Sequence, residues 1–313
     1  MNELVLDRRA AGPDLRVRYL IATLRRVLLR VWRMPGLHSV LRSIVGRMPT
    51  TVRGRVEQER ARVREEELAI SVRNRPRLVP EGELRALLSR GLCALAARHG
   101  RDSLGDYLEF GVYNGTSLTC MHHVLKDVGL DNVRLFGFDS FQGFPPDAAE
   151  EDEGRWQPGR CCSPLELTQA VLNSEGIESD RVTLVPGWFS DTLNDRTRAE
   201  YRIAKSSVIM IDCDLYSSTK QALAFCAPLI RDEALVLFDE YYPTGLGGKH
   251  LGERKAFHEF LQKFPCFDAI PFGQYAQRTQ AFLVYRNSSC AGAASLQAPA
   301  VAQQERSRPT PSI

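Results

Sequence analysis

Short apolar segments alternate with helical segments over residues 105–286, and this alternation restricts the fold more than any other feature of the chain. Strands are expected at residues 106–112, 133–138, 182–185, 207–211 and 235–238, helices at 116–126, 165–172, about 217–229 and 254–264, and a final antiparallel strand pair at 268–271 and 281–285. Repeated strand–helix units place parallel strands between two layers of helices. The pattern therefore predicts an α/β fold with a doubly wound, mostly parallel, seven-stranded sheet and an antiparallel last strand.

Two of the predicted strands end in pairs of carboxylates. Asp212 and Asp214 follow the apolar run at residues 207–211, and Asp239 and Glu240 follow the run at 235–238. Packing alone seldom explains such strand ends, because each buried carboxylate must find a partner or stay in water. In open α/β sheets, ligands bind outside the carboxyl ends of the strands. The functional site is therefore expected at these two strand ends.

Three of these acids suit a divalent cation. Asp214, Asp239 and Glu240 are hard oxygen ligands, which favour Mg²⁺ or Mn²⁺ over zinc. A bound cation lowers the pKa of a coordinated hydroxyl, and one carboxylate can take the released proton. In the structural alternative, some of these acids cap the helix that begins near Ser217 or pair with Arg254 and Lys255.

The loop after the first predicted strand has the composition of a small-ligand site. Gly111 and Gly115 allow a ligand to approach the backbone closely, and the following helix start offers unpaired amides. Glu109 and the wide glycine spacing differ from the GxGxxG pattern that binds a pyrophosphate, and an acid suits a cationic ligand such as a sulfonium. Asp139 ends the next strand and is placed to bind the two hydroxyls of a ribose. Alternatively, Asp139 caps the loop at Ser140.

Positive charge is concentrated in the first third of the chain. Residues 1–100 contain 21 Arg, no Lys and 10 acidic residues, although the whole chain has a formal net charge of only +3. Residues 15–33 form an amphipathic helix by pattern, with an apolar arc opposite an arginine-rich arc. This helix is expected either to contact an anionic membrane surface or to dock on its own domain, a partner or a second subunit. No nucleic acid is expected, because no recognition motif accompanies the arginines.

These observations divide the chain into three parts. Residues 1–79 are expected to be a basic helical extension, with an exposed helix or linker at 55–67, and residues 288–313 a disordered tail rich in Ser, Ala, Pro and Gln. Residues 80–287 are expected to form the domain that contains the functional site, beginning with a packing helix at 81–99. The eight cysteines form no CxxC pair, and neither a membrane span nor a signal peptide is apparent. We therefore expect a cytoplasmic protein. A homo-oligomer is expected as well.

Over residues 80–286, the chain resembles the macrocin O-methyltransferase family, whose members methylate sugar hydroxyls of natural products. The matching motifs are EFGVYNGTS at 109–117, FDSFQGFP at 138–145, DCDLYSST at 212–219, FDEY at 238–241 and GERKAF at 252–257. The resemblance implies a Rossmann-like class I methyltransferase that uses S-adenosylmethionine and Mg²⁺. By position, Asp214, Asp239 and Glu240 fall on the metal-binding acids, and Asp214 also falls on the catalytic base. Glu240 stands where the family usually has a second aspartate.

The expected cofactor-binding residues come from three of these motifs: Glu109, Gly111, Tyr113, Gly115, Thr116, Ser117, Asp139, Ser140 and Asp212. The predicted function is transfer of a methyl group from S-adenosylmethionine to a hydroxyl of a sugar or polyketide-type natural product. Residues 141–144 and the acidic loop after them are expected to form a lid. Two alternatives are a methyltransferase acting on a phenolic diol and a membrane-associated scaffold that keeps the fold without catalysis.

Overall fold

A computed structural model describes residues 43, 45–47, 49–242 and 251–287. The chain divides into two compact units between Asn74 and Arg75. In the first unit, the helix α3 spans Thr50–Arg73 and includes the segment predicted as an exposed helix or linker. The amphipathic helix predicted at 15–33 and the tail predicted at 288–313 lie outside the described residues. None of the described helices is long and apolar enough to cross a membrane.

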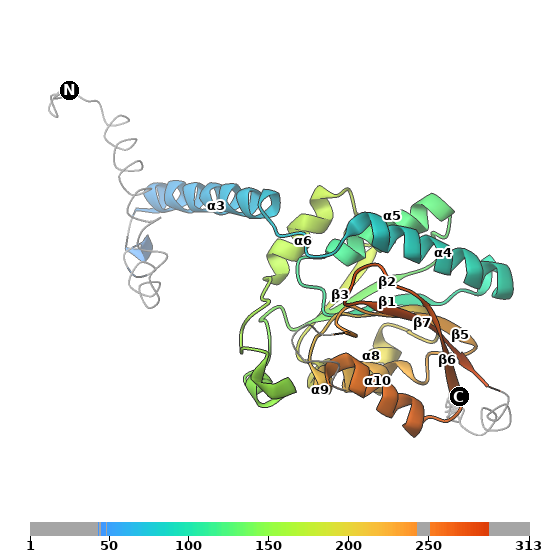
Figure 1. Cartoon of the computed structure of the whole chain (residues 1–313). Helices are drawn as coiled ribbons and strands as arrows, with labels where there is room; N and C mark the ends of the chain where they lie inside the picture. Colours follow the sequence, from blue (N-terminus) through green and yellow to red (C-terminus); the bar gives the residue numbers. More distant parts are fainter. Residues whose placement is uncertain (1–42, 44, 48, 243–250, 288–313) are drawn as a thin grey trace, which may run out of the picture. The chain divides into compact units, whose positions relative to one another are not determined.

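A seven-stranded sheet forms the centre of the second unit, with the strand order β3-β2-β1-β4-β5-β7-β6 (Figure 1). The strands are β1 (Asp106–Phe110), β2 (Leu135–Asp139), β3 (Val182–Pro186), β4 (Ser206–Ile211), β5 (Glu233–Phe238), β6 (Phe267–Gly273) and β7 (Gln280–Arg286). Strands β1 to β5 are parallel, and β7 runs antiparallel to both β5 and β6. This topology confirms the predicted fold class.

Helices cover both faces of the sheet (Figure 1). The helices of the second unit are α4 (Glu81–His99), α5 (Thr116–Val128), α6 (Leu165–Ser174), α7 (Phe189–Thr192), α8 (Asp195–Glu200), α9 (Tyr216–Cys226) and α10 (Gly252–Lys263). Figure 1 shows α4, α5 and α6 on one face and α8, α9 and α10 on the other. The short helices α7 and α8 were not predicted, because four to six residues show too little periodicity.

The two helix layers produce two hydrophobic clusters, one on each face of the sheet. In β1, Tyr107 packs into the cluster under α4 and α5, and Leu108 packs into the cluster under α9 and α10. This alternation follows from the two-residue repeat of a strand. Both faces of β1 are buried, so its sequence is apolar on both sides except for its acids.

The strand order fixes the location of the site. The sheet continues from β1 through β2 to β3 on one side and through β4 to β5 on the other, so the direction of winding reverses between β1 and β4. Ligands of doubly wound sheets bind outside the carboxyl ends of the strands at this reversal. The acids predicted at the ends of β1, β2, β4 and β5 all lie at that edge.

Candidate active site

The β1–α5 loop lies against the end of β4. Gly111 has a φ of +90°, and a Cβ atom added to it would lie 1.8 Å from the carbonyl oxygen of Asp212. A side chain at this position is therefore excluded by the protein's own backbone. Gly115 also has a positive φ, +82°, and it is the N-cap of α5. The two glycines thus shape the loop whether or not a ligand is present.

Glu109 is fully buried at the end of β1. Its carboxyl group accepts hydrogen bonds from the Tyr107 hydroxyl at 2.5 Å and the Ser117 hydroxyl at 2.7 Å. Burial raises the pKa of Glu109 to about 8, although both hydrogen bonds lower it. The group is therefore largely protonated at neutral pH, and it connects the first turn of α5 to β1 instead of presenting a negative charge to a cationic ligand.

Asp139 holds the loop from the end of β2. One carboxylate oxygen accepts hydrogen bonds from the backbone amides of Val112 and Tyr113, at 2.8 and 2.9 Å, and the other accepts one from the Phe141 amide at 2.6 Å. Burial raises the pKa of Asp139, and the three amide bonds oppose that shift. Asp139 thus connects the β1–α5 loop to the loop after β2. In the second loop it caps the backbone amide of Phe141, not Ser140.

The remaining predicted cofactor residues are held by their own neighbours. Thr116 donates a hydrogen bond to the Asn114 side chain, and Ser140 donates one to the carbonyl oxygen of Gly143. Tyr113 has a φ of 50°, and its carbonyl oxygen accepts a hydrogen bond from the Thr168 hydroxyl of α6. Contacts within the protein therefore fix the conformation of this loop.

Asp212 and Asp214 behave differently. Within the described residues, neither carboxylate accepts a hydrogen bond, and Asp214 has a φ of 62°. Burial and the charges of Glu240 and Asp239 raise the pKa of Asp214 to about 7, while Arg155 and Arg278 lower it. Burial and the charges of Asp239 and Asp214 raise the pKa of Asp212. The acids of the two strand ends are therefore close enough to repel one another.

Side chains from two other loops bind the acids at the end of β5. The Tyr275 hydroxyl donates a hydrogen bond to Asp239 at 2.7 Å. Arg278 and Arg155 approach Glu240, with N–O distances of 2.6 and 3.9 Å. Tyr275 and Arg278 come from the β6–β7 loop and Arg155 from the loop after β2. Sequence reasoning missed all three, because a Tyr or Arg in a turn resembles an ordinary surface residue.

Other acids cap the helices next to the site. Glu151 accepts a hydrogen bond from the Ser217 amide at 2.9 Å, so it caps α9. Asp152 accepts hydrogen bonds from the amides of Tyr216 and Gly252, at 3.2 and 2.9 Å, and so joins the starts of α9 and α10. The proposed alternative, in which the site acids cap the helix near Ser217, does not describe this structure. In the sequence, the acidic run at 150–153 was the signal that could have predicted these helix caps.

Arg254 and Lys255, which the sequence offered as partners for the site acids, face aromatic rings. Arg254 lies over Tyr241 and Tyr242, and Lys255 lies 4.1 Å from the ring centre of Tyr216. The buried Glu253 of the same helix accepts a hydrogen bond from the Glu240 amide at 3.0 Å. Helix α10 therefore holds the end of β5 through the hydrogen bond between Glu253 and the Glu240 amide.

Comparison with known proteins identifies the family. Residues 94–262, more than half of the chain, match the family model of macrocin O-methyltransferase (TylF). The chain belongs to the macrocin O-methyltransferase family. This membership confirms the resemblance inferred from the motifs.

Two curated relatives are O-methyltransferases by name, and the name of the first contains a rhamnosyl group. The chain is 31% identical over 172 residues to the 8-demethyl-8-(2,3-dimethoxy-alpha-L-rhamnosyl)-tetracenomycin-C 4'-O-methyltransferase of Streptomyces olivaceus, covering 53% of this chain and 61% of the relative. It is 28% identical over 174 residues to the mycinamicin III 3''-O-methyltransferase of Micromonospora griseorubida, covering 53% and 64%. The match thus spans less than two thirds of either relative. The O-methyltransferase NovP has the same fold, with a TM-score of 0.50 and 20% identity over 65% of this chain and 79% of NovP.

Membership of the macrocin O-methyltransferase family raises the question of whether the site fits a methyl-donor cofactor. Gly115 is the N-cap of α5, and no side chain of the described residues caps the first turn of this helix. Its first amides are therefore available to the carboxylate of an amino-acid group. The loop formed by Gly111, Tyr113 and Asp139 lies next to these amides. This part of the site fits the methionine end of S-adenosylmethionine.

The acids at β4 and β5 match Mg²⁺ in chemistry. They offer carboxylate oxygens, and the repulsion that raises the pKa of Asp214 is what a cation relieves. Among the residues that the structure describes, however, no three His, Cys, Asp or Glu side chains are grouped closely enough to hold a metal ion. Glu240 is also neutralised by Arg278. The donor chemistry fits the ion, and the described side-chain arrangement does not form a complete ligand set.

Proposed function

We propose that this protein is an S-adenosylmethionine-dependent O-methyltransferase that acts on a hydroxyl of a sugar or polyketide-type natural product. The observation that carries the proposal is Asp214, a half-buried carboxylate with a pKa of about 7 at the edge where ligands of this fold bind. A base is most effective when its pKa lies near the working pH. The name of the tetracenomycin relative, which contains a rhamnosyl group, supports a sugar hydroxyl as the acceptor.

The chain's own residues divide the reaction between them. Asp214 accepts the proton of the acceptor hydroxyl as the oxygen forms a bond to the methyl carbon. The bond between sulfur and that carbon breaks, and S-adenosylhomocysteine leaves with the sulfur electron pair. The β1–α5 loop, with the amides of Thr116 and Ser117, holds the methionine part. Glu109 fixes this region by accepting the hydrogen bond from the Ser117 hydroxyl. Asp139 and Ser140 lie beside the ribose, and Asp212 forms the wall between the cofactor and the acceptor. Holding both reactants in line supplies much of the rate.

A divalent cation is the finer part of the proposal. Asp214 and Asp239 would hold Mg²⁺, with Glu240 as the third ligand when it is released from Arg278. When bound, the ion would lower the pKa of the acceptor hydroxyl. Isothermal titration of Mn²⁺ into the wild type and into Asp239→Asn tests this step without any acceptor. Equal binding by the two proteins would remove the metal site from the proposal.

The central experiment is calorimetric titration of S-adenosylmethionine, followed by transfer of a labelled methyl group to a panel of rhamnosylated and other deoxysugar acceptors. Binding and transfer to a sugar are expected. Binding with transfer only to catechols would indicate a phenolic-diol enzyme. A protein that does not bind S-adenosylmethionine would instead be a scaffold with the methyltransferase fold. Unchanged turnover in EDTA would contradict the metal step alone.

The setting of the enzyme is a separate proposal. We propose a cytoplasmic homo-oligomer, and the seven described cysteines, all free thiols, are consistent with a reducing compartment. Peripheral membrane contact through residues 15–33 also stays a prediction. Co-sedimentation with anionic liposomes tests it, using the full chain and a variant in which Arg18, Arg25 and Arg26 are replaced by Gln. Equal sedimentation of the two proteins would exclude contact through the arginine face.

A further inference from the structure

Asn114 connects the proposed cofactor loop to a segment that precedes the family match. Its side chain is buried, donates a hydrogen bond to the carbonyl oxygen of Pro76 at 2.7 Å and accepts one from Thr116 at 2.7 Å. Pro76 belongs to the link between α3 and α4, well before residue 94, where the family match begins. We refer to residues 75–77 as the strap.

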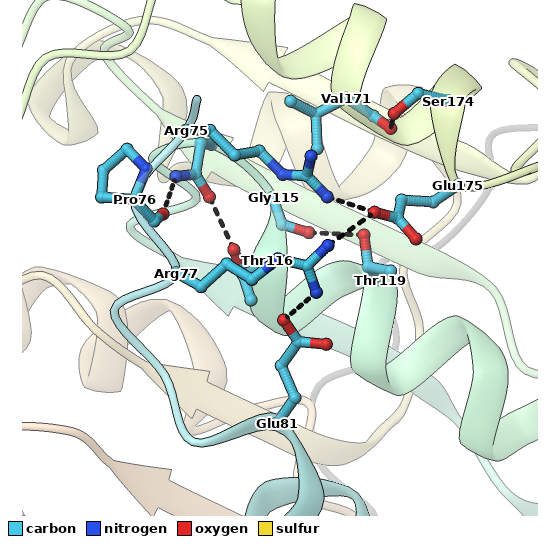
Figure 2. A network of polar contacts seen from close by, with 11 residues as sticks. Arg75, Pro76, Arg77, Glu81, Gly115, Thr116, Thr119, Val171, Ser174 and Glu175 are labelled. Atoms are coloured by element: carbon cyan, nitrogen blue, oxygen red, sulfur yellow. Dashed lines mark hydrogen bonds and ion pairs between the residues drawn. The ribbon is translucent and has the colours of Figure 1, made fainter. Parts of the chain in front are cut away.

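Charged contacts fix the strap to α6. Arg75 and Arg77 both reach Glu175, the residue that follows the last turn of α6, and Arg77 also pairs with Glu81 at 2.6 Å (Figure 2). The Arg75 side chain is only 9% exposed, so its guanidinium is largely shielded from water. Such a pair orders the backbone around it more strongly than an exposed ion pair does.

Helix α6 also holds the loop directly. Thr168 donates a hydrogen bond to the carbonyl oxygen of Tyr113 at 2.6 Å, and a Cβ atom added to Gly115 would lie 3.2 Å from the Leu172 side chain. The loop therefore has α6 on one side and the strap, through Asn114, on another. Glu175 joins the two supports.

We propose that the strap positions the cofactor loop, with Asn114 as a positioning residue for the methionine part of S-adenosylmethionine and Glu175 acting through the strap. The proposal rests on the proposed function, because it assumes that this loop binds the cofactor. It has a specific consequence. Ligands that carry the amino-acid group depend on the strap, whereas a ligand with only the adenosine part depends on it much less, because Asp139 is also held by the Phe141 amide and Ser140 bonds to Gly143, and neither contacts a strap residue among the described hydrogen bonds.

The test compares two ligands on the full-length protein. Dissociation constants for S-adenosylhomocysteine and for methylthioadenosine, which lacks the amino-acid group, are measured by calorimetry. Asn114→Ala removes two hydrogen bonds and is expected to weaken S-adenosylhomocysteine binding about tenfold. Glu175→Gln keeps an acceptor but loses the charge, and about a threefold loss is expected. Methylthioadenosine affinity should stay within about twofold in both variants.

Asp127→Asn is the matched control, because Asp127 pairs with Arg85 at 2.9 Å on an exposed surface away from the loop. It should leave both affinities unchanged. Asn114→Asp provides a second variant, since it keeps an acceptor for Thr116 but cannot donate to Pro76, and it should resemble Asn114→Ala. Thermal unfolding without ligand verifies that each variant is folded.

Three results have distinct meanings. Selective loss of S-adenosylhomocysteine affinity supports the strap. Unchanged affinity in folded Asn114→Ala and Asn114→Asp, or an equal loss for methylthioadenosine, overturns it. A wild-type protein that binds neither ligand contradicts the proposed function itself, independently of the strap.

Discussion

At the ends of β1 and β2, Glu109 and Asp139 accept hydrogen bonds from two hydroxyls and three backbone amides, whereas at the end of β4, Asp212 and Asp214 accept none from the described residues. All four acids lie at one edge of one sheet, where Glu109 is buried and Asp139, Asp212 and Asp214 are half-buried. Buried polar groups that are fully hydrogen-bonded fix a shape, and buried charges without such partners remain costly. The first pair therefore builds the loop, and the second pair retains reactivity toward a proton or a cation.

A raised pKa does not separate the two pairs. Burial raises the pKa of Glu109 to about 8 and that of Asp214 to about 7, so both are perturbed in the way that often marks a functional site. The difference lies in the second cause. Hydrogen bonds oppose the shift at Glu109, while the neighbouring charges of Glu240 and Asp239 add to it at Asp214. The partners of a buried acid thus indicate its role better than its pKa does.

The largest expected effect is at the unpartnered pair. Asp214→Asn removes the proposed base without changing its size, and turnover should fall by about a thousandfold. The dissociation constant of S-adenosylmethionine should change less than about twofold, because Asp214 contacts no residue of the β1–α5 loop in the described hydrogen bonds. Single-turnover transfer of a labelled methyl group measures the first quantity and calorimetry the second. Near-normal turnover would remove Asp214 as the base.

The partnered pair should give the opposite result. Asp139→Asn places a donor where three amides now donate, so at least one loop amide loses its acceptor. We expect about a thirtyfold weaker affinity for S-adenosylmethionine and a smaller change in turnover at saturating cofactor. Asp147→Asn, an exposed acid in the same connection, is the control for charge. If Asp139→Asn lowered turnover without affecting cofactor affinity, the distinction between the two strand ends would fail.

The third effect concerns how the stability of the folded protein depends on pH. The folded-state pKa of Glu109, about 8, lies above its ordinary value, so the folded protein binds a proton that the unfolded chain releases. Stability is therefore fully present below about pH 4.5 and is lost as the pH rises towards 8. Between pH 6 and pH 8 the loss should be about 2 kcal/mol. Glu109→Gln should remove this part of the slope in urea unfolding, and an unchanged slope would show that Glu109 is already ionised.

Much of the architecture was predictable from sequence, because hydrophobic periodicity and acidic strand ends are local signals. The predicted helix at 81–99 coincides with α4, and the acids at the ends of β1, β2, β4 and β5 meet at one edge, as parallel strands require. The partners of those acids were not predictable. Tyr275 and Arg155 reach the site from loops far along the chain, and loop conformation carries no periodic signal. The capping role of Asp152 likewise depends on where two helices begin in space.

The smallest effect concerns a hydrogen bond at the end of β5, next to the unpartnered pair of Asp212 and Asp214. Tyr275→Phe removes the hydroxyl that lies 2.7 Å from an Asp239 oxygen and leaves the ring in place. Losing one hydrogen bond at this end should lower turnover about fivefold while cofactor affinity stays constant. Tyr285→Phe, in β7 and without a hydrogen bond from its hydroxyl to any described residue, should change neither quantity. A loss of cofactor affinity in Tyr275→Phe would mean that the two ends share one scaffold, because a contact at the end of β5 would then be shaping the loop at the end of β1.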